Sequence, residues 1–475
     1  MDSYDLFIAG EKVKTGKQEK VFDKFSGEAF ACVSVAGTDH IETAVAAAEK
    51  TKKTMANLPA HRRSRIIAGA AKIINRESEH FTELIIREAG KPYKFARAEV
   101  ERCVENIEYA AEEAKRIHGE TLPIDAGRAG EGKVGYYERF PAGVVLAISP
   151  FNFPLNLAAH KIAPAIAAGC PVILKPSSLT PLSGIELVRA FNEAGVPPGG
   201  IHALVGPGST VGEALLKDKR ISRISFTGSR EVGERITRIA GIKKITLELG
   251  SNSGAVIDNN IDNMDFVVKR CVMGAFYYQG QVCISVQRIF VHKDIYDKFT
   301  REFVRLTKEW EIGNPLDRET DLGPMISVDE AKRVESWIDE AVDRGAKILL
   351  GGKREGNIYR PTVITDAGAE MKIMRKELFG PAVVIQKIDS FEQGVELCDN
   401  SEYGLQAGVF TCDINRAMKA VKNLDVGGVI INDIPTFRVD HMPYGGNKGS
   451  GLGREGAKFA IEEMTTLRMV VINLS

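Results

Sequence analysis

Apolar residues recur three and four positions apart over much of the first quarter of the chain. This spacing runs through residues 41–57 and 62–88 and continues from about 95 to 117, where opposite charges also occur at i,i+4. Both features are typical of amphipathic helices with one buried face. The pattern therefore predicts three helices after a short hairpin-like start.

The pattern changes in GETLPIDAGRAGEGKVGYYERFPAG (119–143), where glycines and alternating polar and apolar residues replace the helical spacing. Alternation of this kind favours extended strands, and the glycines interrupt them. We expect a hairpin that leaves the main body of the protein.

From residue 143, short apolar runs alternate with helical stretches at 156–168, 181–194 and 209–217. Continuous apolar strands joined by helices form βαβ units and a parallel sheet that is buried on both faces. Four or five such strands predict a dinucleotide-binding type of domain. The runs are VVLAIS, PVILK, IHALVG, ISRISFTG and KKITLELG.

A second alternating region, 255–432, predicts another α/β unit. Helical spacing covers 263–278 and 294–310, and the strand-length runs are RIFVHK, KILLGG, AVVIQKI and GGVIIN. A glycine-rich segment, PYGGNKGSGLGREG (443–456), then precedes a short helix, and TTLRMVVIN predicts a terminal strand.

Length and charge narrow the class of protein. A chain of 475 residues exceeds the limit of about 250–300 residues for one hydrophobic core, so two substantial domains are expected. Lys+Arg and Asp+Glu number 63 each, so no net field attracts nucleic acid or an anionic membrane. No apolar run reaches the roughly 18 residues of a membrane span. The start, MDSYDLFIAGEKVK, lacks the pattern of a signal peptide, and we expect a cytoplasmic protein.

Among the seven scattered cysteines, none of them in a CxxC spacing, Cys283 has an unusual setting. The others are expected to be free thiols without a zinc site or a disulfide framework. In GQVCISVQR (280–288), Gly280 and Gln281 allow close backbone approach to a developing negative charge. A free cysteine is more often a small buried hydrophobe, so from this residue alone a structural role is the stronger interpretation.

Two further residues suggest polar chemistry. Glu248 ends an apolar strand in LELGSNSG, where desolvation would raise its pKa into the range useful for a general base. Asn152 lies in SPFNFPLN, between Pro150 and Pro154, where a rigid amide could donate to an oxyanion. A satisfied structural carboxylate and a turn-forming asparagine are equally open interpretations.

The signals for phosphate binding are a turn and a lysine. SFTGSREVG (225–233) leads from a strand through a Gly/Ser turn into a helix, whose N-terminus can bind phosphate, although the full GxGxxG pattern is absent. Lys175 in ILKPSS ends an apolar strand, at the edge of the sheet where an open α/β sheet binds its ligand.

Together these stretches resemble the aldehyde dehydrogenase superfamily over nearly the whole chain. The motifs occur in the family's order: SPFNFP, LKPSS, FTGS, LELG, GQVC, ELFGP (377–381) and PYGGNKGSGLGREG. HKIAPAIAAG, YYQGQVCISVQR and INDIPTFRVDHMPYGG are similar to the branch of lactaldehyde and non-phosphorylating glyceraldehyde-3-phosphate dehydrogenases.

The resemblance implies an α/β fold in three parts. A Rossmann-like cofactor domain would comprise residues 1–118 and 142–252, and an α/β catalytic domain residues 253–455. A small β element, 119–141 with 456–475, would join subunits into homodimers or homotetramers, because exposed apolar edge strands pair with partners.

The resemblance also implies roles for individual residues. Cys283 would be the nucleophile, Asn152 the oxyanion donor and Glu248 the base in the NAD(P)-dependent oxidation of an aldehyde to its carboxylate. Lys175 would hold the cofactor ribose, Ser229 the pyrophosphate and Glu377 the nicotinamide ribose. The full set implied for NADP or NAD is Ser149, Phe151, Lys175, Ser177, Ser178, Gly208, Phe226, Thr227, Gly228, Ser229, Leu249, Glu377 and Phe379.

Two positions depart from the family's usual pattern. Ser178 stands where many NAD-preferring relatives have a glutamate that accepts the ribose hydroxyls. Without that charge, and with Lys175 near, a 2′-phosphate is tolerated, so we expect use of NADP⁺ with NAD⁺ not excluded. The alternative is that Ser178 is neutral in effect. Ser251 replaces a glycine beside the base, which could alter how Glu248 moves.

The aldehyde pocket is expected at Asn156, His160 and Arg438, with Phe153 and Phe437 close by. A guanidinium in a cleft is a strong site for carboxylate, phosphate or sulfonate. The substrate expected is small and polar: lactaldehyde, glyceraldehyde (3-phosphate) or a short semialdehyde. The alternative is that Arg438 turns away into a structural ion pair.

Three rival functions were weighed. Transfer of the acyl group to coenzyme A is disfavoured by Glu248, because acylating relatives commonly lack this base. An inactive binding or structural oligomer is disfavoured by the joint presence of Cys283, Glu248, Asn152, Lys175 and Glu377. No metal site is expected, since the eight histidines are dispersed without an HxxxH spacing.

Overall fold

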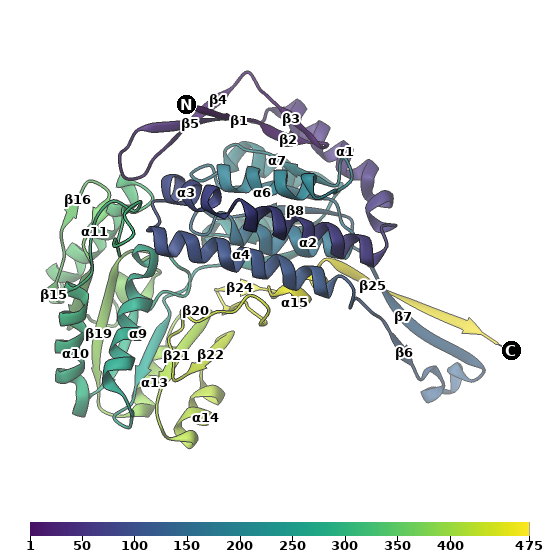
Figure 1. Ribbon diagram of the computed structural model, residues 1–475. Coiled ribbons are helices and arrows are strands. Elements are labelled where there is room, and N and C mark those ends of the chain that lie inside the picture. Colours follow the sequence, from purple (N-terminus) through teal and green to yellow (C-terminus); the bar gives the residue numbers. More distant parts are fainter. Residues whose placement is uncertain (475) are drawn as a thin grey trace.

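The computed structural model describes residues 1–474 as two α/β bodies and a projecting arm (Figure 1). One body is built on an eight-stranded sheet and the other on a seven-stranded sheet, each covered by helices. The α/β fold class is confirmed. No helix within residues 1–474 is long and apolar enough to cross a membrane.

The eight-stranded sheet has the order β24-β12-β11-β8-β9-β10-β2-β3, and β8 to β12 are parallel, as predicted. The chain runs outward through β8, β9 and β10 and then returns to place β11 on the other side of β8. This reversal is a topological switch point, where open α/β sheets bind ligands beyond the strands' carboxyl ends. The strands are β2 (Leu6–Ile8), β3 (Glu11–Val13), β8 (Val144–Ile148), β9 (Val172–Lys175), β10 (Ile201–Ala203), β11 (Ile221–Thr227), β12 (Lys244–Glu248) and β24 (Gly451–Leu452).

The helices of this body mostly follow the predicted ranges. The range 62–88 is an exception, because it divides at Glu77, which adopts φ −102° and ψ 21° between two helices. Apolar spacing continues through the break, so the pattern alone did not reveal it. The helices are α1 (Thr38–Ala56), α2 (Ala60–Arg76), α3 (Ser78–Ala89), α4 (Tyr93–Glu113), α5 (Asn156–Ala168), α6 (Leu182–Glu193), α7 (Glu213–Lys217), α8 (Arg230–Ala240) and α15 (Ala457–Glu463).

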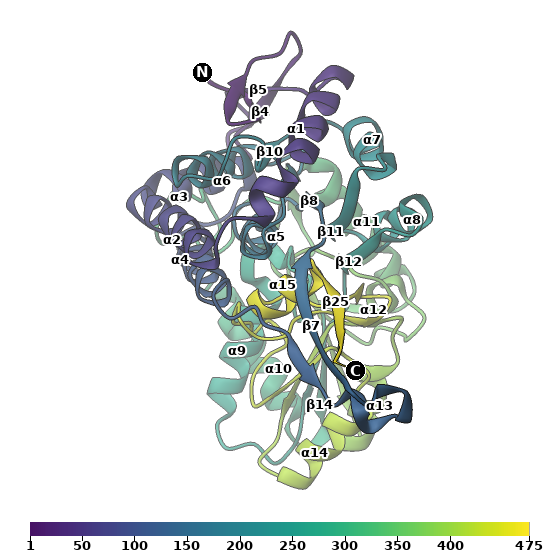
Figure 2. The same ribbon diagram turned by 90° about the vertical axis from the view of Figure 1, so that its right-hand side faces the viewer.

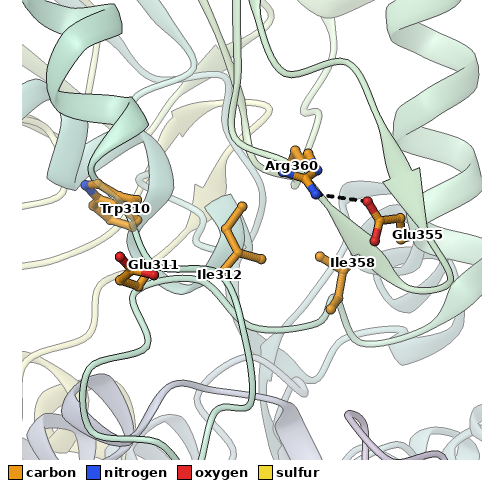
Figure 3. Close-up of a pocket in the computed structure, with 6 residues that line it drawn as sticks. All are labelled: Trp310, Glu311, Ile312, Glu355, Ile358 and Arg360. Atoms are coloured by element: carbon orange, nitrogen blue, oxygen red, sulfur yellow. Dashed lines mark hydrogen bonds and ion pairs between the residues drawn. The ribbon is translucent and has the colours of Figure 1, made fainter.

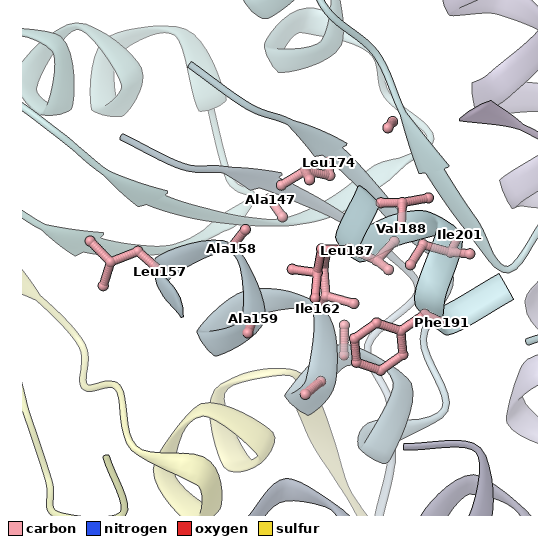
Figure 4. Packing of buried hydrophobic residues seen from close by; sticks show 14 of the residues in the cluster. Ala147, Leu157, Ala158, Ala159, Ile162, Leu174, Leu187, Val188, Phe191 and Ile201 are labelled. Atoms are coloured by element: carbon pink, nitrogen blue, oxygen red, sulfur yellow. The ribbon is translucent and has the colours of Figure 1, made fainter. Parts of the chain in front are cut away.

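The core of this body surrounds α5, all of whose residues are buried. Ile162 of α5 packs with Leu174 of β9 and Phe191 of α6 (Figure 4). A helix that is buried all round has neighbours on every side. Polar residues on α5 are therefore held in fixed positions.

The seven-stranded sheet has the order β15-β18-β19-β14-β13-β21-β22, with β15 antiparallel at one edge. The four strands predicted in this region are all present. The strands are β13 (Gly254–Ile257), β14 (Arg288–His292), β15 (Lys347–Leu350), β18 (Thr362–Thr365), β19 (Ala382–Ile388), β21 (Gln406–Phe410) and β22 (Gly428–Ile431). The helices are α9 (Met264–Phe276), α10 (Lys293–Lys308), α11 (Val328–Asp343), α12 (Lys372–Arg375), α13 (Phe391–Asp399) and α14 (Ile414–Asn423).

The arm is a three-stranded antiparallel sheet of β6 (Glu120–Leu122), β7 (Lys133–Pro141) and β25 (Thr465–Asn473). It extends away from both bodies, with the C-terminus near its tip (Figures 1 and 2). The hairpin and the terminal strand predicted from the sequence are confirmed. Its apolar side chains are exposed, among them Leu467, Met469 and Val471.

The predicted division into domains stays a prediction, with one qualification. β24 lies inside the range 253–455 that was expected to form the catalytic domain, yet it pairs with β12 of the eight-stranded sheet. The first body therefore includes a strand from late in the chain. Another small sheet at the N-terminus contains β1 (Asp2–Tyr4), β4 (Gln18–Phe22) and β5 (Ala29–Ser34).

Candidate active site

The predicted nucleophile follows a strained turn. Tyr278, Gln279 and Gly280 all have left-handed φ angles, of 45°, 55° and 68°. Such backbone is costly for residues other than glycine and persists only where the surroundings enforce it. At Gly280 an added Cβ would lie 2.1 Å from the carbonyl oxygen of Gly380, so only glycine fits. The turn directs the chain to Cys283, which is partly buried.

Side chains of the turn hold it in place. The Tyr278 hydroxyl donates to the carbonyl of Ala89 at 2.8 Å. The amide of Gln279 donates to the carbonyl of Gly90 at 2.9 Å and to that of Pro324 at 2.7 Å. These bonds tie the segment before Cys283 to the first body.

Asn152 lies beside the nucleophile's segment, as the resemblance implied. Its Nδ2 donates to the carbonyl of Gln281 at 2.9 Å. One of its two amide hydrogens is used in this bond, so the other is available for an oxyanion. The loop after Asn152 is fixed by Glu99, whose Oε1 accepts from the backbone N–H groups of Leu155 at 3.0 Å and Asn156 at 3.1 Å.

The Cys283 sulfur contacts one polar side chain, the hydroxyl of Tyr444, at 3.1 Å. Burial raises the pKa of the Cys283 thiol to about 11, against the opposing effects of Tyr444 and the Arg438 guanidinium. A thiolate is the reactive form of cysteine. The site therefore needs groups that favour the anion.

Glu248 ends β12 and is buried, with 3% of its surface exposed. Within residues 1–474 neither of its carboxylate oxygens has a hydrogen-bond partner. Burial and the nearby Glu455 raise the pKa of Glu248 well above its ordinary value. A carboxyl that is easily protonated and unpaired is what a general base for water requires.

A buried cluster of charges lies behind the thiol. Glu455 forms ion pairs with Lys161 at 2.8 Å and with Arg438 at 3.1 Å. Despite its burial, these cations and His160 lower the pKa of Glu455 to about 2. Glu455 is therefore a fixed negative charge, in contrast to Glu248.

Arg438 connects this cluster to the thiol. Its guanidinium carbon lies 3.7 Å from the centre of the Tyr444 ring. Its Nη2 also lies 3.1 Å from Nε2 of His160, which is 2.9 Å from the Asp440 carboxylate. Arg438 thus makes the ion pair that the alternative interpretation anticipated, and it also lies at the site. Its role in substrate binding stays a prediction.

The other predicted pocket residues lie close to this cluster. Asn156 stands one turn before His160 on α5 and accepts from the amide of Asn106 at 3.1 Å. Phe153 is buried and stacks on Tyr277 at a centroid distance of 6.2 Å. Phe437 is exposed.

The predicted cofactor residues lie at the switch point. The ladder aligns Ile148 of β8 with Lys175 of β9, so the strand ends lie side by side. Lys175 is almost fully buried, yet its ammonium bonds only the carbonyl of Pro176, at 3.1 Å, among the described residues. Burial lowers the pKa of Lys175 to about 8. A buried ammonium without an anion fits a polar ligand there.

The phosphate turn has the predicted form. Ser229 caps α8, its hydroxyl accepting from the N–H of Val232 at 3.4 Å, and the preceding Gly228 is bonded to Glu248 O at 3.1 Å. Ser229, Ser178 and Gly208 are exposed, as a site for phosphates and ribose requires. Ser178 donates to the carbonyl of Gly206 at 3.0 Å. These residues fit a dinucleotide; Ser149, Ser177, Phe226, Thr227 and Leu249 lie along the same strand ends and loops.

The segment ELFGP faces the base from the second body. Glu377 accepts from the N–H of Ser251 at 3.0 Å, and burial raises the pKa of Glu377 to about 7. An added Cβ on Gly250 would lie 2.0 Å from the Glu377 carboxylate. Phe379 meets Phe151 edge to face at 5.8 Å, which places both predicted aromatic residues together.

A separate surface pocket of about 340 Å³ lies on the second body (Figure 3). Two of its charged side chains, Arg360 and Glu355, already pair with each other at 3.0 Å. None of the predicted site residues lines it. Its lining is Trp310, Glu311, Ile312, Glu355, Ile358 and Arg360. Residues 1–474 contain no cluster of three or more metal-ligating side chains.

Sequence reasoning missed several members of the site. Tyr444 and Glu455 both lie inside the quoted motif PYGGNKGSGLGREG, so their presence near the thiol could have been inferred from the motif. The signal for Asp440 was only its position two residues after Arg438. Lys161, inside the quoted stretch HKIAPAIAAG, and Arg102, which pairs with Asp440 at 2.7 Å, gave no signal of their own, because a lysine in an apolar helix and an arginine in a charged one are ordinary.

A cysteine set among an amide donor and an unpaired carboxylate, at the ligand-binding edge of a dinucleotide-type sheet, defines a class of cysteine-dependent oxidoreductases. Residues 12–470 match the model of the aldehyde dehydrogenase family. The chain belongs to the aldehyde dehydrogenase family.

Known proteins support this membership over full length. The 3-sulfolactaldehyde dehydrogenase of Priestia aryabhattai is 44% identical over 471 residues, covering 99% of this chain and 98% of that protein. Aldehyde dehydrogenase 21 from Physcomitrella patens, solved with its reaction product succinate, has a TM-score of 0.98 at 39% identity. The match covers 100% of this chain and 98% of that one. Glyceraldehyde-3-phosphate dehydrogenase GapN from Methanocaldococcus jannaschii, solved with NADP, has a TM-score of 0.93 at 40% identity. The match covers 97% of this chain and 100% of that one.

The raised pKa of Glu248 predicts a pH-dependent cost to stability. Above the ordinary carboxyl pKa the unfolded chain ionises while buried Glu248 holds its proton, so folding loses stability as pH rises. Glu248→Gln should therefore unfold at a higher temperature than the wild type at pH 8, and the difference should vanish near pH 4. Thermal melts across this range test it. The exposed Glu108→Gln is the control, and a pH-independent difference for Glu248→Gln would contradict the prediction.

Proposed function

We propose that this enzyme oxidises a small polar aldehyde to its carboxylate with NADP⁺ or NAD⁺, through a covalent adduct on Cys283. The observation that carries the proposal is the junction of three groups. The amide of Asn152 donates at 2.9 Å to the carbonyl of Gln281, two residues before Cys283. The unpaired Glu248 lies close to Gly445, the residue after Tyr444: a Cβ added to Gly445 would be 3.0 Å from Oε1 of Glu248. These are the groups needed to attack a carbonyl, stabilise the oxyanion and activate water.

The first half of the reaction uses Cys283 and Asn152. The thiolate sulfur attacks the aldehyde carbon and forms a thiohemiacetal, and the free amide hydrogen of Asn152 and the Cys283 N–H stabilise its oxygen. Loss of one such donor typically costs about 10²–10³ in rate. When bound, NAD(P)⁺ would supply the hydride acceptor that oxidation of the thiohemiacetal to a thioester requires, and Lys175, Ser229 and Glu377 would hold it.

The second half uses Glu248. The carboxylate takes a proton from a water molecule, the resulting hydroxide attacks the thioester carbon, and the carbon–sulfur bond breaks to release the carboxylate and free Cys283. Burial raises the pKa of Glu248, which makes it a stronger base than an exposed glutamate. Acyl transfer to coenzyme A, the alternative, would not need this base.

Burst kinetics separate the two halves. Glu248→Gln should keep a burst of reduced cofactor near one per site while steady-state turnover falls about 10²–10⁴-fold, the typical contribution of a general base. Cys283→Ala should lose both, and Cys271→Ala, which removes a buried thiol packed in the core around α9, is its control. An undiminished steady state in Glu248→Gln, or an acyl-coenzyme A product when coenzyme A is added, would refute the hydrolytic reaction.

We further propose that the enzyme accepts NADP⁺ at least as well as NAD⁺. Ser178 is neutral and exposed, and Lys175, three residues earlier at the end of β9, has no anionic partner among the described residues. A 2′-phosphate meets attraction there rather than repulsion. Relatives solved with NADP, such as GapN, support this proposal.

Ser178→Glu should reverse the preference. The introduced carboxylate repels a 2′-phosphate, so kcat/KM for NADP⁺ should fall about tenfold or more while that for NAD⁺ changes little. Steady-state kinetics with both cofactors test it, with the exposed Ser26→Glu, outside the predicted cofactor set, as the charge-matched control. A wild-type enzyme with a large preference for NAD⁺ would contradict the proposal.

The aldehyde is proposed to carry an anionic group. The three relatives named above act on or release small anions: a sulfonate, a succinate and a phosphate ester. Arg438 lies against the Tyr444 ring, and its Nε, 3.6 Å from the Asp440 carboxylate, makes no hydrogen bond within residues 1–474. A buried guanidinium with an unused donor can bind a carboxylate, sulfonate or phosphate.

Paired substrates test the role of Arg438. Arg438→Gln should lower kcat/KM for succinic semialdehyde about 10–100-fold, the scale of a hydrogen bond between charged groups. The neutral butanal should be affected much less, and it controls for damage to the ion pair with Glu455. Equal losses for both aldehydes would show that Arg438 does not bind the anionic group of the substrate.

The arm is proposed to join subunits into a homodimer or homotetramer. β25 has apolar side chains exposed along an outer edge that no strand of the described chain pairs. β22 forms an edge of the seven-stranded sheet in the same way. Unpaired apolar edges are sites for pairing with another chain.

We also propose that the protein is located in the cytoplasm.

A further inference from the structure

The surroundings of Cys283 oppose its ionisation more than they favour it. Two carboxylates face the sulfur, Glu248 from the end of β12 and Glu377 from the segment after α12. Two groups that favour the thiolate face it from the segment between β22 and α15, the Tyr444 hydroxyl and the Arg438 guanidinium. The proposed reaction needs the anion, so these two groups require an explanation.

Tyr444 is mounted rigidly against the sulfur. Its ring is buried, and its hydroxyl oxygen lies 3.1 Å from Sγ of Cys283. Its backbone pairs with that of Glu455 through two hydrogen bonds, of 3.1 Å and 2.6 Å. The side chain of Glu455 in turn holds Arg438 at 3.1 Å. Glu455 therefore holds both the ring of Tyr444, through its backbone, and the guanidinium of Arg438 that lies on that ring, through its side chain.

We propose that Tyr444 is a catalytic residue whose hydroxyl donates a hydrogen bond to the Cys283 thiolate, and that Arg438, stacked on the Tyr444 ring, strengthens this donor. The proposal rests on the proposed role of Cys283 as nucleophile. It gives Tyr444 a function in the reaction itself, beyond lining the pocket.

The direction of the hydrogen bond follows from the chemistry of the two groups. A thiolate has no hydrogen, so in the reactive state only the phenol can donate. Burial, with the neighbouring Cys283, raises the pKa of Tyr444 well above its ordinary value, so the hydroxyl keeps its proton wherever the enzyme works. Hydrogen bonds to an ionised acceptor are about twice as strong as neutral ones.

The position of Arg438 adds to this effect. A guanidinium 3.7 Å from the ring centre is attracted to the face of the ring. It draws electron density from the ring and makes the hydroxyl hydrogen more positive, and hydrogen bonds in a buried network polarise one another in this way. A phenylalanine in place of Tyr444 would keep the stacking and lose the donor.

Alkylation of Cys283 tests the proposal without any turnover. The rate of modification by iodoacetamide is followed on the Cys283 peptide by mass spectrometry between pH 7.5 and 9.5, in the full chain without added cofactor. Tyr444→Phe should slow it about three- to tenfold at every pH. A rise of one unit in the pKa of the Cys283 thiol lowers the fraction of thiolate about tenfold. The higher nucleophilicity of a more basic thiolate offsets part of this loss of rate.

The controls separate this effect from a structural one. Tyr359→Phe removes an equally buried hydroxyl on the second body and should leave alkylation unchanged. Loosened packing in Tyr444→Phe would expose the thiol and speed alkylation, the opposite sign. Unchanged or faster alkylation in a folded Tyr444→Phe enzyme would overturn the proposal.

A double-mutant cycle tests the part played by Arg438. Arg438→Gln should slow alkylation in the wild-type background and have a smaller effect in the Tyr444→Phe background, because the charge acts through the ring. Equal effects in both backgrounds would mean that the guanidinium acts on the sulfur directly, and would remove it from the proposal.

Failure of this proposal differs from failure of the proposed function. If Tyr444→Phe leaves alkylation unchanged while Cys283→Ala still abolishes the burst, Cys283 remains the nucleophile and Tyr444 is only structural. If Cys283→Ala keeps the burst, the proposed function itself fails, whatever the alkylation rates show.

Discussion

The active site depends on a backbone turn that would be unfavourable in isolation. Three consecutive left-handed residues, 278–280, precede the nucleophile, and bonds from Tyr278 and Gln279 to the first body and to Pro324 hold them. The stored strain is stabilised by contacts between segments far apart in sequence. The turn fixes where the chain passes Asn152. The hydrogen bond from the Asn152 amide to the carbonyl of Gln281, two residues before Cys283, therefore depends on it.

Buried charge is divided unequally around this turn. Lys91 and Glu99, both fully buried, form an ion pair beneath the loop of Asn152, and Glu455 is neutralised by Lys161 and Arg438. The two carboxylate oxygens of Glu248 have no hydrogen-bond partner among residues 1–474. Paired charges position the loops and remain charged, whereas the unpaired carboxyl can exchange its proton. The same residue type, glutamate, thus serves structure where a cation pairs with it and can exchange a proton where none does.

Much of the fold and of the reactive centre was accessible from the sequence, because strand-length apolar runs and ordered motifs are local signals. The split at Glu77 was not, since apolar spacing continues through it. The pocket role of Arg438 stays a prediction, and its ion pair joins it to Glu455, 17 positions later, which the pattern did not reveal. Tyr444 was quoted inside a motif without a role, because its contact with Cys283 joins residues 161 positions apart. Side-chain partners across such separations follow only from the assembled structure.

One short strand has a consequence for how this protein is made. β24 pairs with β12, so that Gly451 lies opposite Glu248 in the ladder. During synthesis, residue 248 leaves the ribosome about 200 residues before its neighbour exists, at roughly 5–20 residues per second. Throughout that interval the edge of the nascent sheet is open. The edge that ends in Glu248 is therefore completed only after residue 451 has emerged, late in the folding of the first body.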